Sequence, residues 1–247
     1  MIGLFWNIRG MGSPEKIGHL QDLIKDHHLD FIGIIETVKQ EFSATMLGSL
    51  GGGRNLVWRW IPANGRSGGI LVRIDSDRHD ILDTSFGNYH ARLKLQKIDD
   101  KGCWDLVVVY GAAQYAQKNN FLAELANVLH YENRPLVVGG DFNILRKESE
   151  KNKPRGYNKW SFLFNAIIEQ SNLREVGMGN RQYTWFNNQI QSTLEKLDRI
   201  FINNDWEAAF PLTTARILVT TFSDHSPVLM RTEAFVNKKH LFRFELG

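Results

Sequence analysis

The stretch PLVVGGDFN, residues 135–143, is an apolar run that ends in a carboxylate and an amide. Its branched side chains favour a buried strand, and Asp141 and Asn143 stand where that strand ends. A buried strand gains nothing from a carboxylate, because burying an unpaired charge is costly unless its pKa shifts. Functional residues collect in loops at the ends of strands on a rigid sheet. The stretch therefore predicts a core strand with a functional site at its carboxyl end.

Other apolar runs in the chain end in the same way. IGLFWN ends at Asn7, FIGIIE at Glu36 and DLVVVY at Tyr110, while the turn in TTFSDHSPV carries Asp224 and His225. Each residue alone has an ordinary structural explanation, such as an Asn that caps a turn or a Tyr whose hydroxyl finds one hydrogen bond in a core. Taken together, the five strand ends with ligand-type side chains indicate one shared site.

Strand and helix patterns alternate along the chain, with a hairpin-like run of strands in the middle. One helix opens at Ser13-Pro14, with the serine as N-cap and the proline at the first helical position. The other predicted elements are strands at 2–8, 31–35, 55–61, 69–74, 79–86, 90–98, 104–110, 136–139, 182–186, 197–202, 213–219 and 227–231, and helices at 118–130 and 159–170. This mixture favours an α/β fold of two packed mixed sheets flanked by helices over a purely parallel doubly wound sheet.

Composition places the chain among ordinary globular domains. It has 247 residues, of which 43% are hydrophobic and 23% charged, and Lys plus Arg exceeds Asp plus Glu by 30 to 27. The resulting net charge of +3 is compatible with a nucleic-acid partner but does not demand one. The single cysteine, Cys103, excludes an internal disulfide and a cysteine-based zinc site. No linker-like stretch divides the sequence, so we expect one domain over 1–235 and a tail at 236–247.

The sequence also suggests where the protein resides. The longest apolar run, Leu106 to Ala113, is far shorter than the ~20 residues of a membrane helix. Met1 is followed by a strand-like segment without a basic region, which disfavours a secretory signal. We therefore expect an intracellular protein, nuclear or cytoplasmic, that is neither secreted nor bound to a membrane.

The residue types at the strand ends point to a class of chemistry. Glu, Asp and Asn supply hard oxygen ligands, which suit Mg²⁺ or Mn²⁺ rather than zinc. One His positioned by an Asp suits charge stabilisation or acid–base work, and the whole set suits hydrolysis of a phosphodiester. A serine hydrolase is disfavoured because Ser223, Asp224 and His225 are consecutive and no G-x-S-x-G elbow is present. The absence of Walker and G-x-G-x-x-G motifs disfavours an NTPase or a dehydrogenase.

Ordered motifs along nearly the whole chain give a resemblance to a known family. They are WNIRG (6–10), GIIET (33–37), SGGI (67–70), VVY (108–110), GGDFN (139–143), YTW (183–185), LDRIF (197–201) and SDHSP (223–227). In this order they resemble the endonuclease/exonuclease/phosphatase superfamily of DNase-I-like phosphodiesterases. FWNIRGMG, RQYTWFNN and TFSDHSPV look most like the apurinic-type endonuclease domain of plant non-LTR (LINE-like) retrotransposons. The terminal LFRFE resembles the segment that leads from this domain toward a reverse transcriptase.

The resemblance implies a four-layered α/β/β/α sandwich with a metal site at one end of the sheet pair. Glu36 would be the main ligand of a Mg²⁺ ion, for which Mn²⁺ could substitute, and Asn7 would lie beside it. Asp224 would complete the metal or outer network. Arg9 departs from the pattern, because several relatives have an acidic or amide residue there. A cation at this position would repel a second metal ion, so a single Mg²⁺ is favoured, or it would contact a DNA phosphate.

The resemblance also implies roles for the reacting groups. Asp141 would orient or deprotonate the attacking water, and Asn143 would position water and phosphate. His225 would hydrogen-bond the phosphate and stabilise its developing charge, with Asp198 orienting the imidazole. Tyr110 would contact the phosphate or assist the leaving oxygen. A further residue, Thr184, would sit near the DNA backbone.

A basic segment follows the GGDFN motif. Between Arg146 and Trp160 there are six Lys or Arg residues against two Glu, a net charge of +4. Its position suggests that Lys151, Lys153 and Arg155 track a phosphate backbone at the rim of the site. A solvated loop is the equally weighted alternative. The aromatic residues of YTW could stack on DNA, although packing in the core is the simpler interpretation.

These observations predict a Mg²⁺-dependent endonuclease that nicks one strand of double-stranded DNA. Its role would be the target-site nick for retrotransposition, with a reverse transcriptase domain in the same polyprotein as a partner. One alternative keeps the fold but acts on apurinic/apyrimidinic sites or on another phosphodiester. The other alternative is a catalytically silent nucleic-acid-binding module.

Overall fold

The computed structural model describes residues 1–51, 54–65, 67–130, 134–153 and 159–233. These residues form two six-stranded sheets and one two-stranded hairpin. The predicted tail at 236–247 and the predicted DNA contact Arg155 lie outside the described residues. Among the residues described, no helix is long and apolar enough to cross a membrane.

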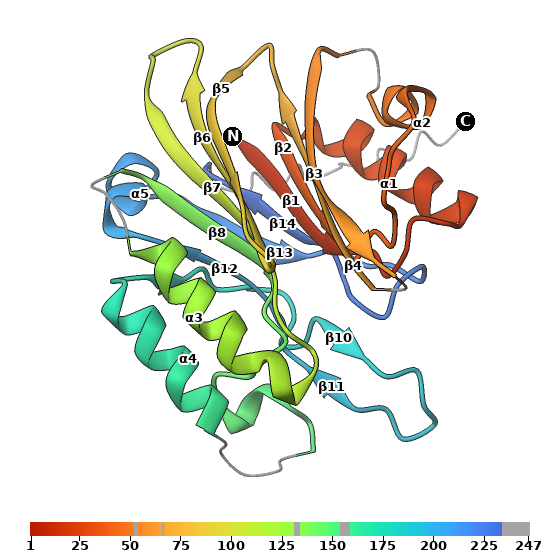
Figure 1. Cartoon of the computed structure of the whole chain (residues 1–247), viewed down its shortest axis with the longest axis vertical. Helices are drawn as coiled ribbons and strands as arrows, with labels where there is room; N and C mark the ends of the chain where they lie inside the picture. Colours follow the sequence, from red (N-terminus) through yellow and green to blue (C-terminus); the bar gives the residue numbers. More distant parts are fainter. Residues whose placement is uncertain (52–53, 66, 131–133, 154–158, 234–247) are drawn as a thin grey trace, which may run out of the picture.

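The first sheet contains the N-terminal strand at its centre (Figure 1). Its strands, in pairing order, are β13 (Thr214–Ile217), β14 (Val228–Arg231), β1 (Ile2–Asn7), β2 (Phe31–Ile35), β4 (Ser67–Asp75) and β3 (Leu56–Asn64). Strands β1 and β2 run parallel, and the other neighbours run antiparallel. The sheet is therefore mixed, as predicted.

The second sheet contains the strand of the GGDFN motif. Its strands, in pairing order, are β5 (His79–Phe86), β6 (His90–Lys97), β7 (Cys103–Tyr110), β8 (Leu136–Asp141), β12 (Asp198–Ile202) and β9 (Arg174–Glu175). Only β7 and β8 run parallel among these pairs. The hairpin of β10 (Trp185–Phe186) and β11 (Leu194–Glu195) extends beyond both sheets (Figure 1).

Helices cover the outer faces of the two sheets (Figure 1). On the first sheet lie α1 (Pro14–His27) and α2 (Ala44–Ser49), and α1 packs Leu20, Leu23 and Ile24 into one apolar cluster with β1 and β2. On the second sheet lie α3 (Lys118–Leu129) and α4 (Lys159–Gln170), which share another cluster with β7 and β8. The short elements are α5 (Asn204–Ala209), η1 (Tyr115–Gln117) and η2 (Glu148–Glu150). The predicted four-layered α/β/β/α sandwich is confirmed.

The two sheets pack face to face around a central apolar core. Phe5 and Val72 of the first sheet meet Leu93 and Val108 of the second. Gly139 in β8 lies so close to the first sheet that an added Cβ would stand 2.5 Å from Phe5 Cζ. A larger side chain there would force the sheets apart, because close-packed interiors do not absorb extra methylenes. Glycine at 139 therefore sets the spacing of the sheets two residues before Asp141.

A buried arginine ties the loop after β8 to the second sheet. The Arg199 side chain is fully buried on β12. Its guanidinium donates to Glu150 at 2.6 and 3.0 Å, to Glu175 at 3.1 Å and to the Lys196 carbonyl at 2.7 Å. Burial alone would raise the pKa of Glu175, but the charges of Arg199 and Lys196 lower that pKa to about 2. This network fixes the course of the chain directly behind the candidate site.

The predicted elements agree with the structure best where they are long. The strand at 31–35 and the helix at 159–170 are confirmed to the residue, and α1 begins at Pro14 with Ser13 in the N-cap position. The Ser13 hydroxyl does not cap the helix, because it contacts the Glu15 carboxylate instead. Most of the predicted strand at 182–186 is wrong, since only its last two residues form β10. The elements α2, α5, β9 and β11 have no counterpart among those predicted.

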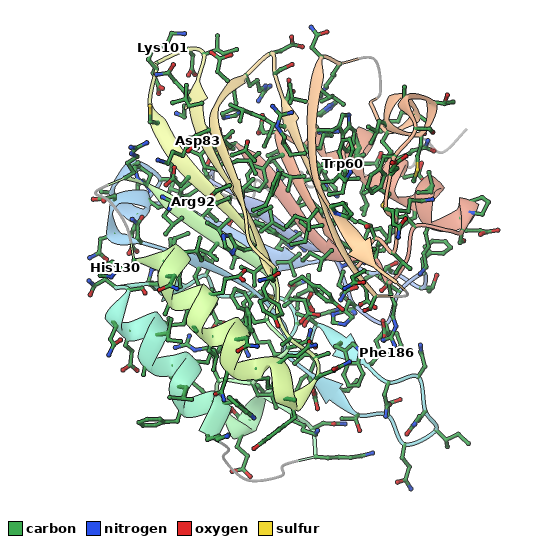
Figure 2. All side chains as sticks on the ribbon, viewed as in Figure 1. Trp60, Asp83, Arg92, Lys101, His130 and Phe186 are labelled. Atoms are coloured by element: carbon green, nitrogen blue, oxygen red, sulfur yellow. The ribbon has the colours of Figure 1, made fainter. Side chains whose placement is uncertain are left out.

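Replacing Glu150 by Ala removes one carboxylate from a guanidinium that has no access to solvent. We expect the free energy of unfolding to fall by about 3–5 kcal/mol, because the remaining charge stays buried and only partly paired. Denaturant unfolding followed by tryptophan fluorescence measures the change. Asp83→Ala is the matched control on edge strand β5 (Figure 2), where an exposed ion pair with Lys94 at 3.9 Å should contribute less than about 1 kcal/mol. Equal losses in the two variants would contradict the role given to Arg199.

Candidate active site

Strand register brings the predicted residues to one end of the sheet pair. In the first sheet, parallel pairing sets Asn7 opposite Ile35, so Glu36 follows at the same end. In the second sheet, Asp141 is opposite Tyr110 on parallel β7 and opposite Asp198 on antiparallel β12. Because β12 begins where β7 and β8 end, these three side chains lie together at one end of the second sheet.

Asp141 is the point at which the two sheets are joined by a polar contact. Its carboxylate accepts a hydrogen bond from Asn7 Nδ2 at 3.0 Å, from Asn143 Nδ2 at 3.0 Å and from the Asn143 backbone amide at 2.9 Å. The residue is 1% exposed, and burial raises its pKa to about 6 against the lowering charge of His225. A buried carboxylate of this kind is suited to taking a proton near neutral pH.

His225 lies between two buried carboxylates. Its Nδ1 is 2.8 Å from Asp198 Oδ2, and its Nε2 is 3.8 Å from Asp141 Oδ2. Burial would lower the pKa of this imidazole, but the charges of Asp198 and Asp141 and the hydrogen bond with Asp198 raise it to about 9. The two carboxylates therefore favour the charged form of the imidazole, in which Nδ1–H donates to Asp198.

The backbone around His225 is held by residues to which no role was assigned from the sequence. Trp6 Nε1 donates to the His225 carbonyl at 3.0 Å. The Ser223 hydroxyl donates to the Asn7 carbonyl at 2.9 Å and accepts from the His225 amide at 3.2 Å. Both contacts tie the 223–227 turn to the end of β1. Their only sequence signal is their place within the WNIRG and SDHSP motifs, which does not show the pairing.

Thr184, which the resemblance placed near the DNA backbone, bonds the protein's own backbone. It is 1% exposed, and its hydroxyl oxygen accepts from the backbone amides of Leu197 at 3.1 Å and Asp198 at 3.0 Å. The residue thereby fixes the first residue of β12, and through it the carboxylate that bonds His225.

Tyr110 lies on the other side of Asp141 from Asp198, next to Glu36. Glu36 has a φ of 56°, and Arg9, Val38 and Asn143 also have positive φ, so four of the eight such non-glycine residues described are at or beside the site. Backbone strain of this kind persists where the surroundings demand it and is concentrated at functional sites. Burial, the charges of Glu36 and Asp141 and a hydrogen bond with Glu36 all raise the pKa of the Tyr110 hydroxyl, which therefore stays protonated.

Asp224 takes part in two contacts through one of its oxygens. Its Oδ2 accepts from Trp185 Nε1 at 2.9 Å and forms an ion pair with the Arg9 guanidinium. Its Oδ1 is buried, and no described residue donates to it. This ion pair partly neutralises Arg9, which the sequence left either to oppose a second metal ion or to contact a DNA phosphate.

A half-buried ammonium group supports the backbone carbonyl of Asn143. Lys118, at the start of α3, donates from Nζ to the Ala112 carbonyl at 3.0 Å and to the Asn143 carbonyl at 2.5 Å. Burial lowers its pKa, and the charge of Asp141 opposes that effect. Nothing in the sequence marks this lysine, because it is one polar residue at the start of an amphipathic helix.

Comparison with known proteins places this arrangement in a family. The sequence model described as the Endonuclease/Exonuclease/phosphatase family matches residues 4–225. The chain belongs to this family. No curated protein matches the chain by sequence. The family membership expected from the motif order is thus confirmed.

Solved structures with the same fold include nucleases. A 3'-5' exonuclease, NExo, from Neisseria meningitidis is 17% identical with a TM-score of 0.74, over 94% of this chain and 100% of that one. The endonuclease domain of TRAS1, a telomere-specific non-LTR retrotransposon, is 15% identical with a TM-score of 0.69, over 96% of this chain and 99% of the TRAS1 chain. An AP endonuclease from Archaeoglobus fulgidus is 15% identical with a TM-score of 0.69, over 94% of this chain and 98% of the AP endonuclease chain. At these identities the likeness shows the shared fold.

Members of the endonuclease/exonuclease/phosphatase family typically need a divalent metal, and the residues present fit one. Asp224 Oδ1 is a buried oxygen without a partner in the described chain, and Glu36 offers a partly exposed carboxylate. The Asn7 side-chain oxygen, which among the described residues accepts only from the Arg9 amide at 3.1 Å, is a third oxygen donor. Oxygen ligands are those preferred by Mg²⁺ and Mn²⁺.

A second group of residues could also hold a metal. The ligand atoms of Asp141, Asp198 and His225 all lie within 4.8 Å of one another. A metal there would require a neutral imidazole with a free nitrogen lone pair. His225 Nδ1 is already engaged with Asp198 at 2.8 Å, whereas Asp224 Oδ1 has no partner in the described chain.

The basic segment after GGDFN is largely engaged within the protein. Lys151 forms an ion pair with Glu195 of β11, and Arg146 bonds Glu175 at 2.7 Å. Lys153 Nζ donates to the Gln191 carbonyl in the β10–β11 hairpin, but no carboxylate in the described chain neutralises it. Lys151, which was expected from the sequence to track a phosphate backbone, thus already has a partner for its charge.

The aromatic residues of the YTW motif also have a structural place. Trp185 is half-buried, with its ring centroid 6.4 Å from that of His225. Its backbone forms an antiparallel bridge with His225, and the next residue, Phe186 (Figure 2), donates its amide to the Asp224 carbonyl at 3.1 Å. Of the two interpretations left open for this tryptophan, packing against the site is the one that these contacts favour.

Replacing Thr184 by Val keeps the shape of the side chain but removes the acceptor of two buried amides. We expect a loss of about 1–3 kcal/mol in the free energy of unfolding, because the two N–H groups stay buried without partners. Denaturant unfolding measures it, and Thr184→Ser should restore most of the stability. If Thr184 instead served DNA directly, the Val variant would keep its stability and lose only affinity for DNA.

Proposed function

We propose that the chain is a Mg²⁺-dependent endonuclease that hydrolyses a phosphodiester bond in DNA and nicks one strand. The observation that carries the proposal is the row Asp198–His225–Asp141. In this row a cationic imidazole lies between two buried carboxylates, at the same end of the sheet pair as Glu36. A cation fixed at this position is suited to an oxyanion, and a neighbouring carboxylate is suited to a proton.

Each residue of the row has a distinct part in hydrolysis. His225 donates Nε2–H to a non-bridging phosphate oxygen and stabilises the charge that develops there, while Asp198 holds its Nδ1. Asp141 accepts the proton of the attacking water, because its carboxylate is oriented by Asn7 and Asn143 and is the basic group of the site. The Tyr110 hydroxyl, which stays protonated, donates a hydrogen bond to the phosphate or to the leaving oxygen.

Glu36, with Asn7 beside it, would hold the Mg²⁺ ion, and Asp224 Oδ1 would join directly or through the outer network. When bound, the ion supplies Lewis-acid stabilisation of phosphate charge. The ion pair of Arg9 with Asp224 places a second positive charge beside this site, which supports one metal ion rather than two. Mn²⁺ can substitute, because it accepts the same oxygen ligands.

The proposed substrate is double-stranded DNA, and the proposed role is the target-site nick for retrotransposition. Support comes from the fold likeness to the TRAS1 endonuclease domain and from the NExo structure described as bound to a product DNA hairpin. A reverse transcriptase domain in the same polyprotein would use the nick, in keeping with the motif resemblance. A nuclear location would follow from this role.

Cleavage at abasic sites is the second candidate, favoured by the fold likeness to an AP endonuclease. A binding module without catalysis is the third. The burial of Asp141, Asp198 and His225 argues against such a module. Buried charges cost stability, so a protein that only binds nucleic acid would gain nothing from keeping them.

The direct test is the conversion of supercoiled plasmid to open circles with Mg²⁺ or with EDTA. We expect nicking with Mg²⁺ only, and a loss of at least about 10²-fold in His225→Ala and Asp141→Asn, which remove the charge stabiliser and the base. His130→Ala, at the end of α3 (Figure 2), is the matched control and should leave the rate unchanged. Near-normal rates in folded site variants would overturn the mechanism, and nicking only of abasic DNA would favour the second candidate.

The contribution of the basic segment is tested by the salt dependence of DNA binding in EDTA. Lys153→Gln should flatten the slope of log Kd against log salt by about 0.9, the value for one phosphate contact. Lys151→Gln should leave the slope unchanged and lower the melting temperature, because its charge already pairs with Glu195. Equal effects of the two variants on the slope would show that the ion pair opens when DNA binds.

A further inference from the structure

Two lysines at the start of the outer helices bond the chain segments that carry the candidate active site. Lys16 is the third residue of α1, on the first sheet, and Lys118 is the first residue of α3, on the second (Figure 1). Each ammonium group donates to two backbone carbonyls, and neither forms an ion pair with a carboxylate of the described chain. Each helix therefore contributes one cation to the end of the sheets at which the polar groups meet.

Lys118 links the segments that follow β7 and β8. Its Nζ donates to the Ala112 carbonyl after β7 and to the Asn143 carbonyl after β8. The last residues of these strands are Tyr110 and Asp141, the proposed phosphate donor and the proposed base. The ammonium group therefore joins the two chain segments at a point two residues beyond each of these site residues.

Close contacts at Gly111 leave these two segments little freedom. The Gly111 amide donates to the Asp141 carbonyl at 2.7 Å, and an added Cβ would lie 2.3 Å from the Phe142 carbonyl oxygen. Asn143 then adopts a φ of 51°, with its carbonyl bonded to Lys118 and its side-chain amide bonded to Asp141 at 3.0 Å. Left-handed backbone of this kind persists where contacts hold it, and Lys118 supplies the contact on the carbonyl side.

Lys16 makes the equivalent contacts on the first sheet. Its Nζ donates to the Ile8 carbonyl at 2.8 Å and to the Arg9 carbonyl at 2.7 Å. These two residues directly follow Asn7, the last residue of β1, and Arg9 has the same φ of 51° as Asn143. The arrangement on the second sheet is thus repeated at the strand end that carries a proposed metal ligand.

The turn held by Lys16 is also bonded to the segment of Glu36. The Gly10 amide donates to the Glu36 carbonyl at 2.7 Å. Burial lowers the pKa of Lys16, and the charges of Asp224 and Glu36 oppose that effect, so the ammonium group lies within electrostatic reach of both carboxylates. Lys16 therefore holds the turn through which Asn7 is aligned with Glu36.

Both lysines occupy places where a cation costs stability. The N-terminal end of a helix carries a partial positive charge, which disfavours a cation in the first turn. Burial adds to the cost, because it lowers the pKa of both ammonium groups. Residues that break a local rule in this way are expected at functional sites. The recurrence of the same costly contact at both strand ends therefore points to a role in the site.

We propose that Lys16 and Lys118 are positioning residues for the two halves of the site. Lys16 aligns the proposed metal ligands Asn7 and Glu36, and Lys118 aligns Tyr110 with the proposed base. The proposal rests on the proposed nuclease function and adds two residues that do not touch the substrate. Such residues matter to the rate, because a misplacement of a reacting group by about 1 Å lowers a rate about 10²-fold.

The test replaces each lysine by Met, which keeps the length of the side chain and removes its N–H donors. Turnover is measured on plasmid with Mg²⁺, and Mn²⁺ affinity is measured by calorimetry without DNA. We expect Lys16→Met and Lys118→Met each to lose at least about tenfold in kcat, with KM within about twofold of wild type. Lys16→Met should also weaken Mn²⁺ binding several-fold, whereas Lys118→Met should leave it unchanged. Lys16→Arg and Lys118→Arg should restore most of the loss, because a guanidinium still donates to carbonyls.

Lys25→Met is the matched control, because this lysine is exposed in the last turn of the same helix as Lys16. It should change neither turnover nor Mn²⁺ affinity. Melting temperature in EDTA checks that each variant folds. Lys16→Gln or Lys118→Gln, which keep one donor group, take the place of a Met variant that does not fold, and the same losses are expected at smaller size.

The proposal is overturned if the folded variants keep wild-type turnover, or if both change Mn²⁺ affinity equally. Tighter Mn²⁺ binding by Lys16→Met would also overturn it, because the lysine would then act by repulsion alone. If the wild type cleaves no DNA, Mn²⁺ affinity still tests Lys16, and a crystal structure of Lys118→Met tests whether Asn143 leaves its positive φ. An unchanged Asn143 would overturn the proposal there, so failure of the nuclease function is seen separately.

Discussion

The site depends on a buried imidazole held between two buried carboxylates that come from neighbouring strands. His225 bonds Asp198 at 2.8 Å and faces Asp141 at 3.8 Å, and all three side chains are nearly inaccessible to solvent. Buried charges of this kind are tolerated only where each has a partner, so the surrounding structure must keep the row in place. Thr184 does this for Asp198 through two backbone amides, and Asn7 does it for Asp141 from the other sheet.

The same constraint explains why the fold brings two sheets together at this end. Glu36 and Asn7, the proposed metal ligands, belong to the first sheet, whereas Asp141 and Asp198, part of the proposed acid–base row, belong to the second. Their separation is set by close packing at Gly139 and Phe5, two residues before each of the polar groups that meet across the interface. The hydrogen bond between Asn7 and Asp141 is therefore a consequence of core packing, and core packing links the stability of the sandwich to the chemistry at its edge.

Much of this could be predicted from sequence where a pattern is local and long. Apolar runs that end in Asn7, Glu36 or Asp141 identify core strands and their functional ends, because burial makes a carboxylate there hard to explain otherwise. Contacts between distant segments could not be predicted. The burial of Thr184 behind β12 and the pairing of Lys151 with Glu195 depend on which surfaces meet in three dimensions. Short elements such as α5 escape prediction for a related reason, since six residues show no periodicity and packing decides their form.

The position of the metal is measured most directly in a crystal of the protein soaked in Mn²⁺, with the ion located by its anomalous scattering. We predict one peak at Glu36 and Asn7, with the imidazole of His225 still bonded to Asp198 and free of metal. A peak among Asp141, Asp198 and His225, which are also close enough to hold an ion, would contradict the assignment of a cationic histidine and with it the proposed division of labour.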